Sequence, residues 1–274
     1  MRFVEKAKTL AADIICFDLE DSVPDNEKDT ARRIIAETLL ARQQEYSGHV
    51  YVRTNSPESG LIPDDLKAIL QKGIDGIVVP KVNDAYEMLE IKKHIVMLEK
   101  ERKTDKITLI PSIETARGVV NAYSIASADE RIKALVFGVF DFLYDMRLDY
   151  DEHDPAGYSY VRAKIPVDAR AAGVHAIDSI WQKIDDIGGL TKDAAMARRL
   201  GYSGKSIIHP SQIVPVHNVF RPSKNEVEWA KKVVQVLGPA MNKGTGRGAV
   251  RLEGKMVDAV HYKQAKAILD AADV

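Results

Sequence analysis

The chain lacks the features that would mark a secreted or membrane-embedded protein. Cys16 is the only cysteine in 274 residues, which excludes an internal disulfide and a cluster of metal-binding thiolates. Because Cys16 lies in the apolar run 14–17, we expect it to be a buried core residue, and we expect a reducing cytoplasm. No apolar run approaches the about 20 residues of a membrane-spanning helix, and residues 1–6 do not begin a long apolar stretch.

A large excess of charge of either sign is also missing. Lys and Arg number 39 and Asp and Glu number 40, for a formal net charge of −1. We therefore expect neither nucleic acid nor a membrane surface as a partner. Hydrophobic residues make up 45% of the chain, which provides material for one large core. The composition is typical of an ordinary soluble enzyme.

Short apolar runs alternate with longer amphipathic segments along most of the chain. The segments predict helices such as 25–43, 64–72, 83–101 and 190–200, and the runs predict strands at 14–18, 50–53, 76–79, 107–110, 134–137, 174–177 and 205–208. This alternation predicts a parallel sheet covered by helices, and the number of units favours an α/β fold of the TIM (β/α)8 barrel type over an open sheet. Active sites of such barrels lie at the carboxyl ends of the strands.

Two carboxylates follow successive predicted strands. Glu114 lies in SIETARG (112–118) and Asp141 in FGVFDF (137–142), each just after an apolar run. Mg²⁺ takes oxygen ligands, keeps several waters and often uses only one or two protein carboxylates, which leaves positions for an oxygen-rich substrate. The pair therefore predicts a metal-dependent enzyme.

Polar residues follow nearly every other predicted strand as well. Each one alone is explained equally well as a cap of the helix that comes next. Their recurrence favours a common site, because one ring of strand ends would bring them together: Asp18, Glu20, Asp21, Arg53, Asn55, Lys81, Glu114, Arg117, Asp141, Asp178 and His209.

Eight segments, in order and nearly end to end, resemble the HpcH/HpaI aldolase and citrate lyase β-subunit-like family. They are DLEDSVPDNEKDTAR (18–32), VRTN (52–55), PK (80–81), SIETARG (112–118), FGVFDF (137–142), GYSGKSIIHPSQI (201–213), FRPS (220–223) and GKMVDAV (254–260). Within the family the chain is most similar to lyases that cleave or form malyl-CoA or citramalyl-CoA. The resemblance implies a carbon–carbon lyase that uses Mg²⁺, or Mn²⁺ in its place, and a CoA thioester substrate, which it splits into acetyl-CoA and a 2-oxo acid.

The resemblance also implies roles for single residues. Glu114 and Asp141 take the places of the family's two metal ligands, and the oxo-acid would bind at that metal. Arg53 takes the place of an arginine that contacts the oxo-acid, where its guanidinium would bind a carboxylate and stabilise a developing enolate. Glu20 and Asp21 match acids that would hydrogen-bond waters around the metal. Helix capping is the alternative for Asp21.

The C-terminal segment carries the last expected catalytic residue, Asp258 in GKMVDAV. In similar lyases the aspartate at this place comes from a neighbouring subunit and acts on the methyl group of acetyl-CoA. The resemblance therefore implies a (β/α) barrel domain at 1–220, a helical lid at 221–274 and a homo-oligomer, a trimer or a hexamer. The glycine-rich stretch 238–248 is interpreted as a flexible linker. Without the family, Asp258 would be interpreted as the N-cap of the last helix, 259–272.

The chain departs from the family at two places. It begins on a helix, RFVEKA, which the family precedes with a strand, so we expect the first barrel strand to be absent and the sheet to have two open edges. Phe140 stands where an acid is common, which would alter substrate choice.

Lys81 is interpreted as a wall or structural lysine, because a metal-stabilised enolate needs no Schiff base. Neither a P-loop nor a dinucleotide-binding motif is present in the sequence.

Three functions stay open. The first is the acyl-CoA lyase, supported by Glu114, Asp141, Arg53 and Asp258 together. The second is a metal-dependent aldolase that releases pyruvate or a similar oxo-acid from a CoA-free hydroxy acid, a branch of the family that lacks the lid aspartate. The third is a catalytically silent oligomer that binds metal and oxo-acid, which the expected absence of the first strand suggests.

Overall fold

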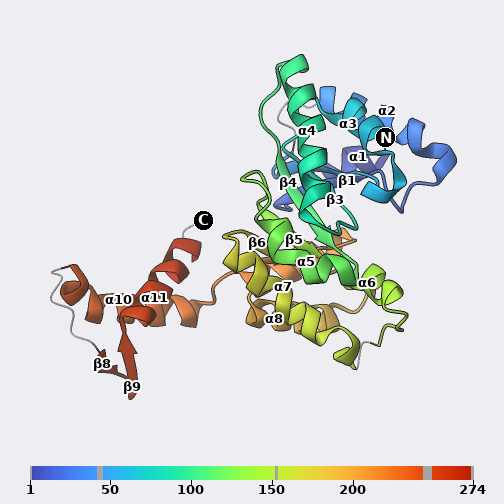
Figure 1. The fold of residues 1–274 in the computed structure, drawn as a ribbon. Helices are drawn as coiled ribbons and strands as arrows, with labels where there is room; N and C mark the ends of the chain where they lie inside the picture. Colours follow the sequence, from blue (N-terminus) through green and yellow to red (C-terminus); the bar gives the residue numbers. More distant parts are fainter. Residues whose placement is uncertain (1, 42–45, 152–153, 243–248, 273–274) are drawn as a thin grey trace. The chain divides into compact units, whose positions relative to one another are not determined.

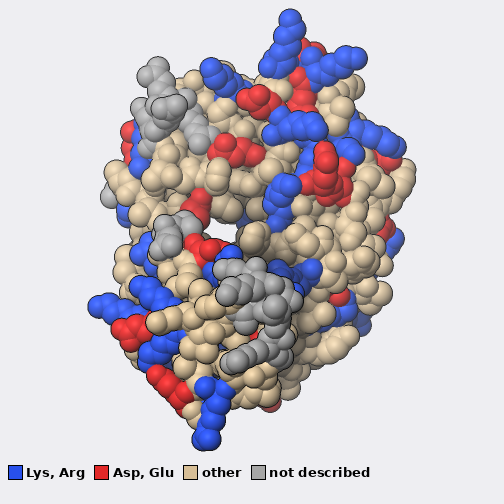
Figure 2. Space-filling model, turned by 90° about the vertical axis from the view of Figure 1, so that its left-hand side faces the viewer, with Lys and Arg blue, Asp and Glu red and all other residues tan. Residues whose placement is uncertain are grey.

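The structure, a computed structural model, describes residues 2–41, 46–151, 154–242 and 249–272 (Figure 1). The chain divides into two compact units, Met1–Val216 and His217–Val274. No helix in the described part of the chain is long and apolar enough to cross a membrane. On the face shown in Figure 2, basic and acidic side chains are interspersed, in keeping with the balanced composition.

Seven parallel strands form the sheet of the first unit. They are β1 Ile14–Asp18, β2 His49–Arg53, β3 Gly76–Val79, β4 Thr108–Ile113, β5 Ala134–Phe137, β6 His175–Asp178 and β7 Gly204–Lys205. Each strand pairs with the next along the chain, which is the order of a barrel wall, whereas the order in a doubly wound sheet reverses near its centre. The predicted parallel α/β sheet is confirmed. Of the described strands, β1 and β7 each pair on one side only, so these seven do not close an eight-stranded barrel.

Helices follow every strand and pack against one another in chain order, α2 on α3, α3 on α4, α4 on α5, α5 on α7 and α7 on α8. Their bounds are α1 Arg2–Ala7, α2 Lys28–Leu40, α3 Ile62–Ile69, α4 Ala85–Arg102, α5 Ala116–Ala126, α6 Val139–Asp145, α7 Ser159–Ala171, α8 Ile187–Leu200 and α9 Ile213–Phe220. Single 3₁₀ turns are η1 Asp25–Glu27, η2 Pro57–Ser59, η3 Pro155–Gly157 and η4 Pro210–Gln212. The predicted helices are present. The first one ends at Leu40 rather than at 43, and residues 42–45 lie outside the described part.

Local capping explains where several helices begin. The side chains of Asp84, Thr115 and Asp186 accept hydrogen bonds from backbone N–H groups in the first turns of α4, α5 and α8. Each cap lies in a loop that follows a strand. These three helices therefore begin at the carboxyl edge of the sheet, where the polar residues that end the strands also lie.

The strands bury alternate residues on opposite faces of the sheet. Toward one face, Val50, Val52 and Ile77 are fully buried. On the other face one apolar cluster takes side chains from β1 through β6: Tyr51, Ile110 and Ala134 at its centre, with Ile14, Val78, Val136 and Ile177 against them. A single cluster that spans six strands is what the interior layer of a barrel wall requires.

Cys16 is exposed to solvent, so the prediction of a buried core cysteine is wrong. Its neighbour Ile15 is buried, whereas Cys16 lies on the face of its register partner Tyr51, on β1, which pairs on one side only among the described strands. The run 14–17 is apolar at every position, so the sequence offered no alternation from which the two faces could be told apart.

The second unit is a helix pair with a β-hairpin. It contains α10 Lys224–Asn242, the antiparallel strands β8 Ala249–Leu252 and β9 Lys255–Asp258, and α11 Ala259–Ala272. Its core is small, with Ala230, Val233, Leu237, Val257 and Ala265 buried. The predicted linker at 238–248 is wrong over its first part, because α10 continues through Gly238 to Asn242; residues 243–248 lie outside the described part.

Candidate active site at the carboxyl ends of the strands

Charged side chains from five strand ends, β1 to β5, converge at the carboxyl edge of the sheet. We call this group the acid-rich cluster; its members, joined by contacts or by electrostatic coupling, are Asp18, Glu20, Asp21, Arg53, Lys81, Glu114 and Asp141. Acids outnumber bases five to two in this set. The cluster therefore carries a net negative charge before any ligand binds.

Arg53, the last residue of β2, is held in a fork by Asp18, the last residue of β1 and its register partner. Its Nε and Nη2 donate to Asp18 Oδ1 and Oδ2, both at 2.6 Å, and its Nη1 lies 2.9 Å from Glu20 Oε2. Burial raises the pKa of Asp18, but the hydrogen bonds and charge of Arg53 outweigh it and lower that pKa to about 2. Asp18, to which the sequence assigned no role of its own, thus orients the guanidinium. Arg53 keeps 29% of its side chain exposed, so an incoming anion can still reach it.

Glu20 and Asp21 lie in the loop between β1 and η1. Glu20 is buried, and burial raises its pKa although Lys81 and Arg53 oppose the rise. The side chain of Asp21 is 61% exposed and makes its ion pair with Lys81 rather than capping the next helix, since the residue before η1 is Pro24 and makes no side-chain cap. The structure brings Glu20 into contact with both Arg53 and Lys81, and Asp21 into contact with Lys81.

Lys81 contacts three acids of the cluster. Its Nζ lies 2.5 Å from Glu20 Oε1, 3.1 Å from Asp21 Oδ2 and 3.3 Å from Asp141 Oδ1. Burial lowers the pKa of Lys81, but the hydrogen bond and charge of Glu20, with the charge of Asp141, outweigh it and raise that pKa. A lysine with a raised pKa is protonated and is a poor Schiff-base nucleophile. The only advance signal for these contacts was its place directly after a strand.

Glu114 is a buried acid with an unused oxygen. It follows β4, only 5% of it is exposed, and its Oε2 is buried without a hydrogen-bond partner. Burial, followed by the negative charges of Asp141 and Glu20, raises the pKa of Glu114 to about 7. Its side chain lies against the backbone of Gly138, where an added Cβ would come within 2.5 Å of Glu114 Cγ. Only glycine leaves room for the acid at this place.

Asp141 lies in the first turn of α6, directly after β5. Its side chain is 38% exposed, and it faces Lys81. The start of α6 is held by Ser179, whose hydroxyl accepts a hydrogen bond from the backbone N–H of Val139 at 3.1 Å. Phe140, in the place where the family has an acid, packs on Tyr150 with ring centroids 4.9 Å apart. The predicted pair of Glu114 and Asp141 is thus close enough for one charge to raise the pKa of the other.

Asp258 belongs to the second unit, at the end of β9. Its Oδ1 accepts a hydrogen bond from the backbone N–H of Val260 at 3.0 Å and lies 2.7 Å from His261 Nδ1. The hydrogen bonds with His261 lower the pKa of Asp258. The residue therefore caps α11, as the sequence predicts when it is considered without the family, and it is held as a carboxylate.

The other polar residues that follow strands make contacts outside the acid-rich cluster. Asp178, after β6, belongs to what we call the balanced cluster, a buried set of two acids and two bases: Arg162, Asp178, Asp193 and Lys205. Asn55 binds the buried Asp65, Arg117 pairs with Asp84 on the surface, and His209 caps η4. The common site predicted from the polar residues at the strand ends was therefore too large, because Asn55, Arg117, Asp178 and His209 make other contacts.

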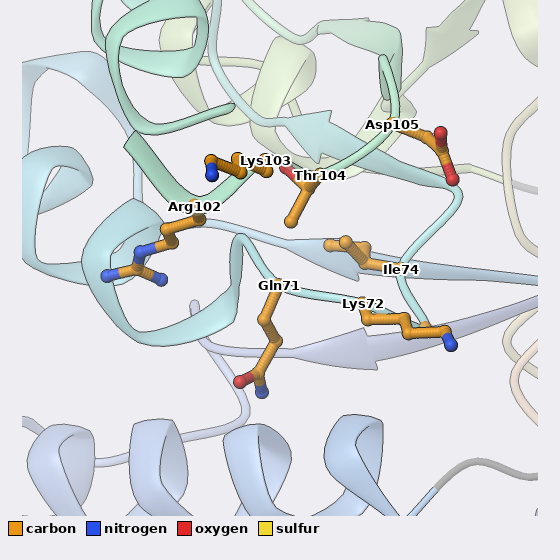
Figure 3. A pocket seen from close by; sticks show the side chains of 8 residues that line it. Gln71, Lys72, Ile74, Arg102, Lys103, Thr104 and Asp105 are labelled. Carbon is orange, nitrogen blue, oxygen red and sulfur yellow. The ribbon is translucent and has the colours of Figure 1, made fainter. Parts of the chain in front are cut away.

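A pocket of about 440 Å³ lies at the opposite, amino-terminal edge of the sheet (Figure 3). Ile74 and Asp105, which line it, precede β3 and β4. Two of its three basic residues, Arg102 and Lys103, lie at the C-terminal end of α4, where a positive charge interacts favourably with the helix dipole. None of the predicted site residues lines this pocket, so we do not assign the active site to it.

The acid-rich cluster fits a hard divalent cation. Glu114 Oε2 is a buried oxygen without a donor, and Asp141 is a second oxygen donor from the next strand end. In the described part of the chain no group of three or more His, Cys, Asp or Glu side chains is arranged to hold a metal ion. Mg²⁺ does not need such a group, because it is commonly bound by one or two carboxylates together with waters and substrate oxygens.

Comparison with known proteins finds relatives that cover nearly the whole chain. The model of the HpcH/HpaI aldolase/citrate lyase family matches residues 1–210. The citrate lyase subunit beta of Escherichia coli (strain K12) is 36% identical over 270 residues, which cover 96% of this chain and 86% of the relative. The mitochondrial citramalyl-CoA lyase of Rattus norvegicus is 31% identical over 284 residues, which cover 98% of this chain and 82% of the relative.

A solved structure has the same fold over the whole chain. Protein CitE from Mycobacterium tuberculosis, in complex with magnesium, acetoacetate and coenzyme A, superimposes with a TM-score of 0.79 at 29% identity, covering 100% of this chain and 94% of that chain. The family predicted from the eight segments is therefore confirmed. This chain belongs to the HpcH/HpaI aldolase/citrate lyase family, a family of enzymes whose relatives compared above bear lyase names.

Proposed function

We propose that the protein is a Mg²⁺-dependent carbon–carbon lyase that cleaves or forms a 3-hydroxyacyl-CoA, such as malyl-CoA or citramalyl-CoA. The products of cleavage would be acetyl-CoA and a 2-oxo acid. The observation that carries the proposal is the buried, unpartnered Oε2 of Glu114 beside Asp141, in the same cluster as an oriented Arg53. The lyase names of the relatives, and the magnesium and coenzyme A bound to the M. tuberculosis protein, support the choice of cofactor and substrate.

Glu114 and Asp141 would hold the metal. When bound, Mg²⁺ would supply Lewis-acid polarisation of the oxo-acid carbonyl and would offset the negative charge of the cluster. Glu20 and Asp21 would accept hydrogen bonds from surrounding waters and so orient the site. The lack of a side chain at Gly138 leaves the room that the Glu114 side chain occupies.

Arg53 would bind the oxo-acid carboxylate and stabilise negative charge that develops on the thioester oxygen. The fork with Asp18 holds the guanidinium before substrate arrives, so little reorganisation is needed as charge develops. Its raised pKa keeps it a cation throughout. A substrate anion would use N–H groups that the contacts with Asp18 and Glu20 leave over.

Asp258 would move the proton. In the synthetic direction its carboxylate removes a proton from the thioester methyl group, and the resulting carbanion carbon attacks the carbonyl carbon of the oxo-acid, whose oxygen takes up the carbonyl electron pair and then a proton from solvent water. In the cleavage direction the 3-hydroxyl group gives its proton to solvent water and the carbon–carbon bond breaks as the oxo-acid carbonyl forms. The electron pair passes to the thioester enolate, and Asp258, having taken up a proton from solvent, gives it to the carbon that becomes the methyl group. The hydrogen bonds with His261, which lower the pKa of Asp258, favour the ionised form that the synthetic direction needs.

Residues 221–274 would act as a lid that completes the site of a neighbouring subunit, in a homotrimer or a hexamer in the cytoplasm. The small core of the second unit and its separation as a compact unit support this arrangement. The barrel domain would then be 1–220, with the seven described strands as its wall.

The direct test is release of acetyl-CoA from malyl-CoA and citramalyl-CoA by purified protein with Mg²⁺. Glu114→Gln and Asp258→Asn are expected to lower kcat at least about 100-fold, since each removes a metal ligand or the acid–base group. Asp64→Asn, at an exposed surface pair with Lys67, is the matched acid-to-amide control and should keep wild-type activity. Tight binding of pyruvate or glyoxylate with no thioester turnover would instead select the CoA-free aldolase or the silent binder.

A further inference from the structure

Lys81 has a backbone conformation that its residue type disfavours. Its φ is 52°, in the left-handed region, although it is neither glycine nor asparagine. Such a conformation persists where the surrounding structure holds it, and it is found often at functional sites. Directly after β3, this conformation directs the side chain into the acid-rich cluster.

The ammonium of Lys81 joins three loops of the sheet edge. Glu20 and Asp21 follow β1, Lys81 follows β3, and Asp141 follows β5, and all three acids lie within 3.3 Å of Nζ. Only 28% of the lysine side chain is exposed, so water screens these contacts poorly. Lys81 therefore connects the loop that carries Glu20 and Asp21 with helix α6, which carries the proposed metal ligand Asp141.

Lys81 also carries the second of the two positive charges in the acid-rich cluster. Arg53, the other base, is engaged in its fork with Asp18 and in its contact with Glu20. Without Lys81 the cluster would hold five acids and one base. A more negative site attracts a divalent cation more strongly and repels the carboxylate of an oxo-acid more strongly.

We propose that Lys81 is a positioning residue that sets the charge balance of the site, so that an anionic 2-oxo acid binds beside a divalent cation. Its ammonium offsets the negative charge of Glu20, Asp21 and Asp141, which weakens cation binding and strengthens binding of the oxo-acid. This inference rests on the proposed function, because it assumes that Mg²⁺ and a 2-oxo acid share the cluster.

The chain offers a matched control in Lys103. Its φ is 54°, nearly that of Lys81, and it is exposed at the C-terminal end of α4, at the opposite edge of the sheet (Figure 3). Asparagine tolerates the left-handed region better than most residues. Lys→Asn at the two positions therefore removes the same charge from the same backbone conformation in two different surroundings.

The test measures binding, without turnover, by titration calorimetry of the full chain with Mg²⁺ alone and then with pyruvate at saturating Mg²⁺. Lys81→Asn is expected to raise the affinity for Mg²⁺ and to lower the affinity for pyruvate, each about tenfold, from the loss of one nearby charge in a partly buried site. Lys81→Arg keeps the charge and should shift both affinities less. Lys103→Asn should leave both unchanged.

The opposite signs separate charge balance from mere structural support. A loss of both affinities together, or no change in either, while wild-type protein binds both ligands, would overturn this inference and leave the proposed function standing. Wild-type protein that binds neither Mg²⁺ nor pyruvate would overturn the proposed function and this inference with it. Lys81→Gly, which relieves the backbone as well as removing the charge, is the second variant should Lys81→Asn not fold, and it must shift the affinities in the same two directions.

Discussion

The two charged clusters at the carboxyl ends of the strands differ in how completely their charges are matched. The balanced cluster, on β6, β7, α7 and α8, pairs two acids with two bases at 2.5–2.7 Å. The acid-rich cluster, on β1 to β5, has five acids for two bases and leaves the buried Glu114 Oε2 without a partner. One sheet edge thus carries both a closed ion network and an open one.

We infer from this difference that the fully paired charges serve the fold and the incompletely paired acids serve the proposed metal site. A buried charge without a partner is unfavourable, so a fully paired set serves to hold elements together. Lys205 Nζ reaches Asp178, Asp193 and the carbonyl oxygen of Ser179, and so joins β6, β7 and α8. An incompletely paired set of acids is instead prepared for a cation that comes from outside. The predictions below test this distinction.

Breaking the balanced cluster should have the largest effect on stability. Lys205→Met leaves Asp178, which is fully buried, and Asp193 with a single remaining base, and we expect a loss of about 3–5 kcal/mol in the free energy of unfolding. Urea denaturation measures it. Lys106→Met, at an exposed pair with Glu130, is the control and should change the free energy of unfolding by less than about 0.5 kcal/mol. A loss below about 1 kcal/mol at Lys205 would show that the network does not hold these elements.

Removing an acid from the acid-rich cluster should have the opposite sign. The pKa of Glu114 is raised from 4.5 to about 7, so the folded state binds a proton that the unfolded state has released between these pH values. Stability therefore falls as pH rises from 4.5 to 7 and stays lower above it, by about 3 kcal/mol for this one group. Glu114→Gln, which has no charge to bury, should be more stable than wild type by up to that amount at pH 8 in the presence of a chelator.

Urea denaturation at pH 4.5 and pH 8 measures this difference. The stability advantage of Glu114→Gln should disappear at pH 4.5, where the wild-type carboxyl is protonated in the folded state. An advantage that does not depend on pH would contradict the charge explanation. The gain in stability together with loss of activity would mark Glu114 as a residue retained for function rather than for folding.

The smallest effect is expected at the link between the two clusters. Ser179, whose carbonyl oxygen binds Lys205, accepts the Val139 N–H with its hydroxyl and so fixes the start of α6. Ser179→Ala leaves that buried N–H without its acceptor, and we expect a loss of about 1 kcal/mol in the free energy of unfolding. Mg²⁺ binding should weaken a few-fold, since Asp141 lies in the first turn of α6. Ser179→Thr keeps the hydroxyl and should restore both values; equal losses in the two variants would point to packing.

The positions of the strands followed from the sequence because buried parallel strands are continuous apolar runs between polar segments. Six of the seven predicted strands agree with the structure to within a few residues. The seventh was predicted to reach 208 but ends at Lys205, because Ile208 is 47% exposed and its N–H donates to the side chain of Gln212 rather than to a strand. Composition alone does not show where an apolar run leaves the sheet.

The site was partly predictable for the same reason. Glu114, Asp141, Arg53, Glu20 and Asp21 lie directly after apolar runs, and parallel strands bring their carboxyl ends to one edge. Asn55 and Asp178 have the same pattern in the sequence but belong to structural contacts. A residue's place after a strand does not say which neighbours it meets across the edge.

The local order of apolar and polar residues was enough to place acids and bases at the carboxyl ends of parallel strands. Their partners depend on how the strands and loops come together in the fold. The fork of Arg53 on Asp18, the three acids around Lys81 and the raised pKa of Glu114 depend on distances between loops far apart in the chain. They depend also on how much water each charge loses, and desolvation is a property of the assembled fold rather than of any segment.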